Sequence, residues 1–348
     1  MEGKLGKLVG VRYTEEVIMS NAEGKVAAVI PCFRERAQIL RVLESIGDEV
    51  DAIFVVDDGC PDKTGAFVEE RCDDDRVEVI FGECNRGVGG AVKLGYEYAL
   101  HAGCEVIVKL DGDGQHDASL IKHMSELILR KECDYAKGNR FFFLESLAQM
   151  PRKRVLGNAF LAFVSKFSTG YWSISDPANG FTAISAKVLM RIPLKKVADG
   201  YFFESDMLFR LSTLRAKVQD APMNSLYGHE TSYLKGYREL FPFAGKSLVN
   251  FLKRIFYTYY LRGMSATSVE LPLGVLLTSF GAFFGLHNWI VSSQTGVPAS
   301  AGTVMLAALP LVTGFQMLIA VLSADMLQEP SQPISPKLSG VRYPNELA

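Results

Sequence analysis

The chain has 348 residues, which is more than one typical domain, and its formal net charge is −2 at neutral pH. So small a charge excludes a broad basic surface for nucleic acid, and we expect no nucleic-acid partner. The first 24 residues carry charges throughout and lack the apolar core of a secretory signal. We therefore expect this leader to stay in the cytoplasm, ahead of one large core with further segments attached.

Strand-like and helix-like segments alternate over the first 130 residues. Apolar runs predict strands at 25–31, 51–57, 77–81 and 105–110, and helical spacing predicts helices at 36–47, 61–72, 90–101 and from 118 onward. Alternation with short connections is typical of an α/β domain with a mainly parallel, Rossmann-like sheet and helices on both faces. Its functional edge is expected at the carboxyl ends of the strands.

One strand end is rich in oxygen ligands. The apolar run 105–110 stops at Asp111, and Asp113 and Gln115 follow on alternate residues, separated by Gly112 and Gly114. Two carboxylates and an amide oxygen suit a hard cation, Mg²⁺ or Mn²⁺, better than zinc. A surface Asp-Gly turn is the simpler alternative for such a short motif taken alone.

Three other strand ends or loops carry unusual residues, and together they suggest a nucleotide pocket. The loop after the first strand holds Pro31, Phe33 and Glu35, and the second strand ends in Asp57 and Asp58. The third strand is followed by the glycine-rich segment 85–90, which ends in Gly90. We expect Phe33 against a base, Asp57 accepting from a base N–H and Asp58 directed toward a ribose. The glycine-rich helix start is expected near the phosphates, although turns and tight packing explain each motif singly.

The ordered set Val-Ile-Pro-x-Phe-x-Glu, Val-Val-Asp-Asp-Gly, Asn-Arg-Gly-Val-Gly-Gly-Ala and Asp-Gly-Asp-Gly-Gln resembles the family 2 glycosyltransferases of GT-A fold. With two apolar segments near the carboxyl end, it is most similar to their polyprenyl-phosphate branch, the dolichyl-phosphate mannose or glucose synthase-like proteins. Departures are Arg34 where Asn is frequent, Cys60 where Ser is usual and Val88 where Lys often stands.

The resemblance implies a site for each substrate and for a metal ion. A nucleotide-sugar donor, linked to UDP or GDP, would contact Pro31, Phe33, Glu35, Asp57, Asp58, Gly90, Asp111, Gly112 and Ser232. Mg²⁺ or Mn²⁺ would be held by Asp111, Asp113 and Gln115. Related proteins are often tetramers, so a homo-oligomer is a further expectation.

The acceptor side is expected in the second half of the catalytic domain. Candidate catalytic residues besides Asp113 are Arg140, with Arg152 or Arg154 as a second cation, and the acids Glu204 and Asp206. A polyprenyl phosphate has a second pKa near ~6 and needs no strong base, so cations that bring two anions together suffice. Helix amino-terminal charge compensation is the alternative for the two acids.

The carboxyl-terminal part is apolar. No Asp, Glu, Lys or Arg occurs from 271 to 324, and 271–291 and 304–323 are each long enough to cross a lipid bilayer. Cations precede the first of these segments and the connecting loop has no charge, so the catalytic domain and both termini are expected in the cytoplasm. We divide the chain into a leader (1–24), a catalytic domain (25–235), amphipathic juxtamembrane helices (236–268), two transmembrane helices (269–326) and a flexible tail (327–348).

The resulting hypothesis is a metal-dependent, membrane-bound inverting enzyme that transfers a sugar from a nucleotide to a polyprenyl phosphate such as undecaprenyl or dolichyl phosphate. A polysaccharide synthase is one alternative, but the Gln-x-x-Arg-Trp segment of such enzymes is absent here. A catalytically silent membrane scaffold for lipid-sugar export is the other, and an intact acidic set argues against it.

Overall fold

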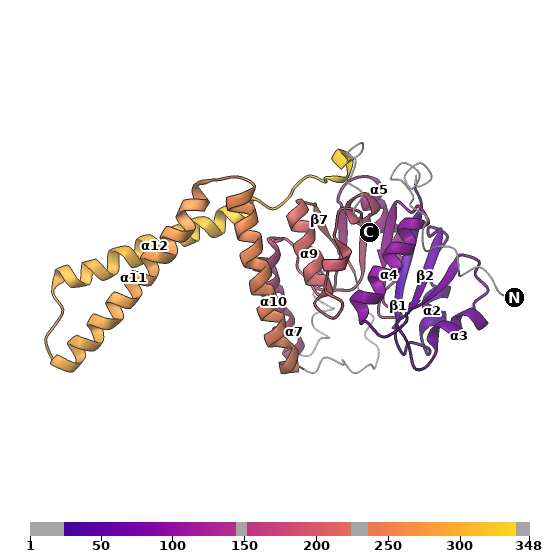
Figure 1. The fold of residues 1–348 in the computed structure, drawn as a ribbon, viewed down its shortest axis with the longest axis horizontal. Coiled ribbons are helices and arrows are strands. Elements are labelled where there is room, and N and C mark those ends of the chain that lie inside the picture. Colours follow the sequence, from indigo (N-terminus) through magenta and orange to yellow (C-terminus); the bar gives the residue numbers. More distant parts are fainter. Residues whose placement is uncertain (1–23, 144–151, 224–235, 339–348) are drawn as a thin grey trace. The chain divides into compact units, whose positions relative to one another are not determined.

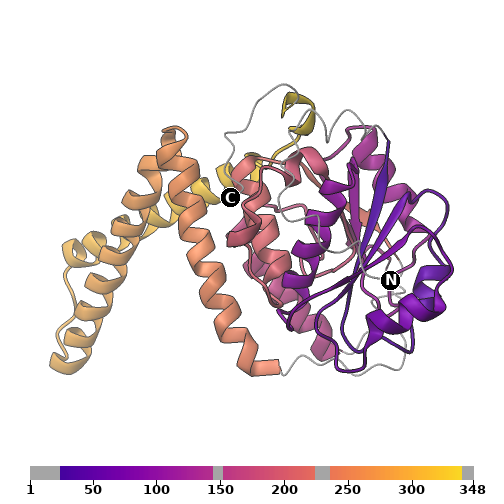
Figure 2. The same ribbon diagram turned by 45° about the vertical axis from the view of Figure 1, so that its right-hand side comes forward.

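A computed structural model of the chain describes residues 24–143, 152–223 and 236–338. The chain forms two compact units: residues up to 248 together with those from 330 make the first, and residues 249–329 make the second. Figures 1 and 2 show the ribbon from two directions.

The first unit is built on a seven-stranded sheet with the order β3-β2-β1-β4-β6-β5-β7. Its strands are β1 (Val26–Cys32), β2 (Ala52–Asp57), β3 (Val77–Phe81), β4 (Val106–Lys109), β5 (Tyr135–Asn139), β6 (Thr182–Ser185) and β7 (Val218–Pro222). All neighbours pair in parallel except β6, which is antiparallel to both β4 and β5. The predicted mainly parallel sheet is confirmed, with β6 as the one reversed strand.

Helices cover the sheet (Figure 2). Those of the first unit are α2 (Ile39–Glu44), α3 (Thr64–Arg71), α4 (Val88–His101), α5 (Leu120–Leu129), α7 (Arg152–Thr169), α8 (Ala186–Leu189), η1 (Leu194–Lys196) and α9 (Phe203–Leu214). Helix α10 (Gly236–Phe256) runs across the boundary between the two units. Helix α2 is shorter than the predicted 36–47 because the carbonyl of Glu35 first accepts from Gln38 and Ile39 in a turn.

Alternate residues of each strand feed two separate cores. Ala27 and Val29 of β1 belong to one buried cluster with α4, α8 and α9. Ala28 and Ile30 belong to the other, with α2, α3 and α5. This two-sided burial explains why the central strands are continuous apolar runs. Because β1 pairs in parallel with β2 and with β4, the carboxyl ends of these three strands lie at the same edge of the sheet.

The second unit contains η2 (Tyr257–Leu261) and two long helices, α11 (Ala266–Thr295) and α12 (Ala301–Leu327). Both helices are long and apolar enough to cross a membrane. In the most apolar stretch of 18 residues in each helix, only 11% is buried inside the protein. Small residues bring the two helices close: a Cβ added to Gly281 would lie 2.6 Å from the backbone nitrogen of Leu311. The two predicted apolar helices are confirmed, with wider bounds.

The segment after α12 returns to the first unit. Both carboxylate oxygens of Asp134 accept from this segment, one from the backbone N–H of Ile334 and the other from that of Ser335, each at 2.8 Å. The side chains of Ile334 and Leu338 pack against the α4 side core, and Ser335–Leu338 form the short helix η3. The prediction of a flexible tail from 327 is therefore wrong for residues 330–338, because a buried carboxylate supplies the partner that the tail sequence alone does not reveal.

Candidate active site

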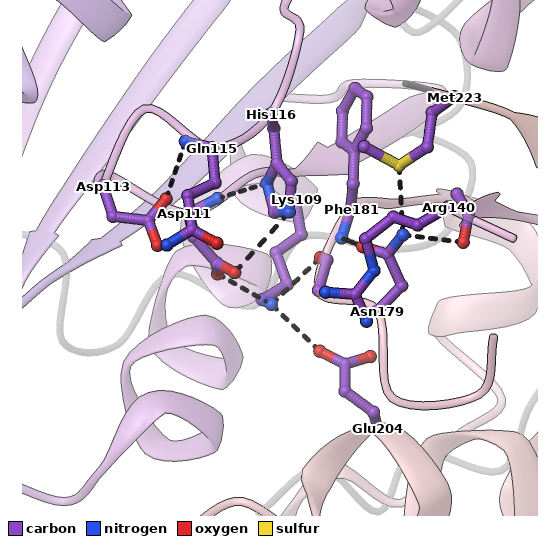
Figure 3. A network of polar contacts seen from close by, with 12 residues as sticks. Lys109, Asp111, Asp113, Gln115, His116, Arg140, Asn179, Phe181, Glu204 and Met223 are labelled. Atoms are coloured by element: carbon purple, nitrogen blue, oxygen red, sulfur yellow. Dashed lines mark hydrogen bonds and ion pairs between the residues drawn. The ribbon is translucent and has the colours of Figure 1, made fainter. Parts of the chain in front are cut away.

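The loop that follows β4 carries the predicted metal ligands (Figure 3). Its first part lies against the end of β1, since a Cβ added to Gly112 would lie 3.1 Å from Cys32 Sγ and 3.5 Å from Glu35 Cγ. Asp113 shapes the loop because its Oδ1 accepts from the backbone N–H of Gln115 at 3.0 Å. In the view of Figure 3, Asp111, Asp113 and Gln115 project toward the same region.

The oxygen atoms on the loop after β4 are of the kind that bind a hard cation such as Mg²⁺ or Mn²⁺. Among the described residues, no three His, Cys, Asp or Glu side chains gather into a metal cluster. The candidate ligands on the loop are two carboxylates and one amide oxygen, those of Asp111, Asp113 and Gln115. Mg²⁺ and Mn²⁺ are commonly held by one or two carboxylates, with water and substrate phosphates completing the shell.

A buried lysine fixes the first carboxylate. Lys109, the last residue of β4, has a side chain that is 2% exposed, and its Nζ lies 3.0 Å from Asp111 Oδ1. The same ammonium contacts Glu204 Oε1 at 2.9 Å and donates to the carbonyl of Gly180 at 3.0 Å. A charged lysine inside a strand is costly unless it is paired, and here every N–H of the ammonium has an acceptor.

Charges around this loop set the protonation of two groups. Burial alone would raise the pKa of Asp111, but Lys109, His116 and Arg140 together lower it to about 2. Burial, which outweighs the opposing effect of Asp111, lowers the pKa of His116 to about 4. At neutral pH Asp111 is therefore charged and His116 is neutral. The backbone N–H of Asp111 donates to Nδ1 of His116 at 3.1 Å, which requires that nitrogen to be unprotonated.

Arg140 lies at the end of β5 and is oriented by Asp176. Its Nε donates to Asp176 Oδ2 at 2.7 Å and its Nη2 to Oδ1 at 3.0 Å, while Asp176 is 1% exposed. A bidentate pair of this kind fixes the plane of the guanidinium as well as its distance. Arg140, the predicted catalytic cation, also lies close enough to Asp111 for its charge to lower the pKa of that carboxyl.

The predicted base-contacting residues are divided between exposed and buried positions. Phe33 is 38% exposed at the end of β1, whereas Asp57 is buried. Asp57 accepts from the backbone N–H groups of Cys60 and Gly65, both at 2.6 Å. Asp58 accepts from those of Arg86 and Gly87 at 2.9 and 2.8 Å. In this structure both aspartates organise loops, so their contacts with base and ribose stay predictions, as do those of Pro31 and Glu35.

The glycine-rich start of α4 is covered by the chain itself. The N–H of Gly90 donates to the carbonyl of Asp199 at 3.1 Å. A Cβ added to Gly89 would lie 2.5 Å from the carbonyl oxygen of Ala198, and Lys93 donates to the carbonyl of Val197 at 2.8 Å. The helix start thus packs against residues 197–199 in this structure, and the contact of Gly90 with the phosphates stays a prediction. The glycines allow residues 197–199 to pack closely.

The two acids proposed near the acceptor are internal. Glu204 is 9% exposed, and its second oxygen, Oε2, lies 3.4 Å from the buried Nζ of Lys137. Asp206 is 5% exposed and accepts from the backbone N–H of Ala198 at 3.0 Å. Both carboxylates are thus occupied by internal partners in this structure, and the catalytic role predicted for them stays a prediction. Their position at the start of α9 could be predicted, but their partners could not.

Two further predictions fall outside the described residues. Ser232 is one of them. The other concerns the side chains of Arg152 and Arg154, although their backbone begins α7.

Sequence reasoning missed Lys109, His116, Asp176 and Gly180 as parts of this site. One signal was available: Lys109 and Lys137 are charged residues within otherwise buried strands, so each requires a buried acid. Nothing in the spacing indicates that Glu204, 95 residues further along the chain, is the shared partner.

The family profile described as Glycosyl transferase family 2 matches residues 27–192. A relative in Methanocaldococcus jannaschii, the uncharacterized protein MJ0544, is 30% identical over 60% of this chain and 91% of its own length. The polyprenol monophosphomannose synthase of Mycolicibacterium smegmatis is 28% identical over 57% of this chain and 76% of that protein. The UDP-N-acetylglucosamine–dolichyl-phosphate N-acetylglucosaminyltransferase of Methanococcus voltae is 26% identical over 59% and 87%.

A solved structure shares the fold. It is glucosyl-3-phosphoglycerate synthase from Mycobacterium tuberculosis in complex with Mn²⁺, UDP and glucosyl-3-phosphoglycerate, with a TM-score of 0.50 and 17% identity over 70% of this chain and 84% of that one. The chain thus belongs to glycosyl transferase family 2 and has the GT-A fold. Its similarity to relatives named for polyprenyl phosphates places it in the polyprenyl-phosphate branch that the motifs indicated.

Proposed function

We propose that this protein is a membrane-bound inverting glycosyltransferase that moves a sugar from a nucleotide-sugar donor to a polyprenyl phosphate. The observation that carries the proposal is the Asp111–Gln115 loop together with the oriented Arg140, in a chain that also has two apolar helices of membrane-spanning length. The relatives' names give the same chemical class of acceptor.

Different residues of the chain would meet the two anions of the reaction, the departing nucleoside diphosphate and the acceptor phosphate. Asp111, Asp113 and Gln115 would hold Mg²⁺ or Mn²⁺, which when bound supplies positive charge to the departing nucleoside diphosphate. Arg140 presents a second, fixed cation. With Asp176 holding two of its N–H groups, the guanidinium loses little freedom when it meets an acceptor phosphate.

No strong base is required in this reaction. An oxygen of the lipid phosphate attacks the anomeric carbon while the bond from that carbon to the nucleoside diphosphate oxygen breaks, which inverts the configuration. The phosphate is already ionised at neutral pH because its second pKa is near ~6. The internal partners of Glu204 and Asp206 agree with a reaction that needs no carboxylate base.

The charge pattern supports a cytoplasmic catalytic domain. Cations are concentrated before α11, and the loop between α11 and α12 has none. By the positive-inside rule this pattern favours both termini on the cytoplasmic side.

A pair of matched variants tests the proposed metal loop. Asp113→Asn and Asp117→Asn each remove one negative charge, and each can keep its turn because an Asn oxygen can still accept from the backbone N–H two residues on. We expect Asp113→Asn to abolish transfer to polyprenyl phosphate and Asp117→Asn to retain it. Transfer by Asp113→Asn at the wild-type rate, with the divalent ion chelated, would refute the assignment.

A further inference from the structure

A buried chain of charges links helix α9 to the acidic loop. Glu204 on α9 contacts the ammonium of Lys109 at 2.9 Å, and that ammonium contacts Asp111 Oδ1 at 3.0 Å. The side chains of Lys109 and Glu204 are 2% and 11% exposed, so water screens the contact between them little, whereas the Asp111 side chain is 33% exposed. A carboxylate from the second half of the domain therefore reaches the loop after β4 through a single cation (Figure 3).

The linking ammonium has no rotational freedom left. Its three acceptors are Asp111, Glu204 and the carbonyl of Gly180, and an ammonium has three N–H groups. Glu204 is also held from its other side, because the Nζ of Lys137 lies 3.4 Å from Oε2 and donates to the carbonyl of Asn179 at 2.7 Å. The arrangement thus fixes Lys109 in one orientation.

Asp111 is confined from a second direction. A Cβ added to Gly180 would overlap Asp111 Oδ2 and would lie 2.7 Å from the Nζ of Lys109. The ammonium therefore holds one oxygen of the carboxylate, and the backbone at Gly180 lies directly beside the other. Only a glycine leaves space for the carboxylate in this position.

We infer that Lys109 and Glu204 are positioning residues, with Glu204 orienting the ammonium that sets Asp111 for a divalent cation. The inference rests on the proposed function and adds a role for Glu204: it acts through Lys109 on the donor side of the site and does not act on the acceptor. Gly180 has a role as well: because it lacks a side chain, it leaves space for the Asp111 carboxylate.

Two variants disturb Asp111 by different routes. Glu204→Gln keeps an oxygen that can accept from Lys109 but removes the charge, and Gly180→Ala introduces the overlapping Cβ. Mn²⁺ alone, titrated into the full chain in detergent and followed by electron paramagnetic resonance, should bind about tenfold more weakly to both variants. In Glu204→Gln the hydrogen bond from Lys109 loses its charge assistance, and in Gly180→Ala the Cβ displaces the Asp111 carboxylate. Matched controls are Glu126→Gln, which removes a surface charge paired with Arg130, and Gly157→Ala, whose Cβ has nothing within 4 Å.

Transfer kinetics separate positioning from direct catalysis. We expect the KM for polyprenyl phosphate to be unchanged in Glu204→Gln and most of the lost rate to return at high Mn²⁺. The near-ultraviolet circular dichroism of each variant, matched to wild type, establishes that it has folded.

Three outcomes would overturn the inference. If Glu204→Gln loses turnover with unchanged Mn²⁺ affinity and no rescue, Glu204 acts on the reacting groups. If both variants match wild type in Mn²⁺ affinity and rate, the buried link has no bearing on Asp111. If wild type itself neither binds Mn²⁺ nor transfers sugar, the proposed function fails and the inference fails with it.

Discussion

Replacing Asp134 by Asn should release the segment 330–338 from the catalytic unit. The Asp134 carboxylate is fully buried and accepts from three backbone N–H groups, those of Lys217, Ile334 and Ser335, each at 2.8 Å. A hydrogen bond to a charged group contributes about 1.5–3 kcal/mol, so the two that involve the returning segment contribute roughly 3–6 kcal/mol to its docking.

An Asn of the same size keeps one oxygen and presents an NH₂ group to the remaining N–H donors. We expect about half of that free energy to be lost, roughly 1.5–3 kcal/mol, which corresponds to a rise of about 10- to 150-fold in the undocked population. Hydrogen exchange measured by mass spectrometry reports this directly, because the amides of Ile334 and Ser335 exchange only when the segment opens.

Asp75→Asn is the matched control, since Asp75 is an exposed aspartate of the same unit. Exchange of the peptide that contains Ile334 should accelerate in Asp134→Asn and stay at the wild-type rate in Asp75→Asn. Equal exchange rates in wild type and Asp134→Asn would show that the carboxylate does not hold the segment.

Three further predictions concern the histidine, the arginine and the hairpin. The pKa of His116 is lowered to about 4 in the folded protein against about 6.5 unfolded, so the unfolded chain binds the extra proton first. The free energy of unfolding of the metal-free protein should therefore fall by up to ~3 kcal/mol as the pH drops from 6.5 to 4. His116→Gln should remove this part of the slope in chemical denaturation, and an unchanged slope would contradict the assignment. Arg140→Lys cannot reproduce the two hydrogen bonds to Asp176, so kcat/KM for transfer should fall about 10- to 100-fold while the protein still folds. A wild-type kcat/KM would show that the bidentate Arg140–Asp176 pair is not needed for transfer. Gly281→Ala places a Cβ 2.6 Å from the backbone nitrogen of Leu311 and should lower the thermal stability of the helix pair. Gly302→Ala in α12, whose Cβ meets Ser300 Oγ at an ordinary 3.8 Å, is the comparison for crowding; equal midpoints would refute close packing at Gly281.

The sequence predicted strands and helices well where a local run of apolar residues is enough to mark a buried segment. The strands at Val26–Cys32 and Val77–Phe81 and the two apolar helices follow from local runs of apolar residues, which need no knowledge of the rest of the chain. The loop at Asp111 also follows a parallel strand, as predicted, whereas its role in holding a metal stays a prediction.

Roles that depend on distant partners could not be predicted in this way. The sequence places Glu204 at a helix start but does not indicate its contacts with Lys109 and Lys137. It predicts a glycine-rich helix start at Gly90 but not that the carbonyl of Asp199 accepts from the Gly90 N–H. A composition rich in proline suggested a disordered tail, yet Ser335 bonds to a carboxylate 201 residues earlier. In each case the deciding contact is a hydrogen bond or ion pair across the fold, which leaves no periodic pattern in the sequence.

Lipid extraction after sugar transfer shows whether the protein glycosylates a polyprenyl phosphate. The purified full chain would be incubated with a polyprenyl phosphate, Mn²⁺ and a panel of radiolabelled nucleotide sugars, with a chelator in a parallel sample. We predict label in the lipid phase from one donor, as a glycosyl polyprenyl phosphate, and none when the metal is chelated or Asp113 is replaced by Asn. Label that stays in the aqueous phase with every donor, or that enters the lipid equally well with the metal chelated, would contradict this prediction.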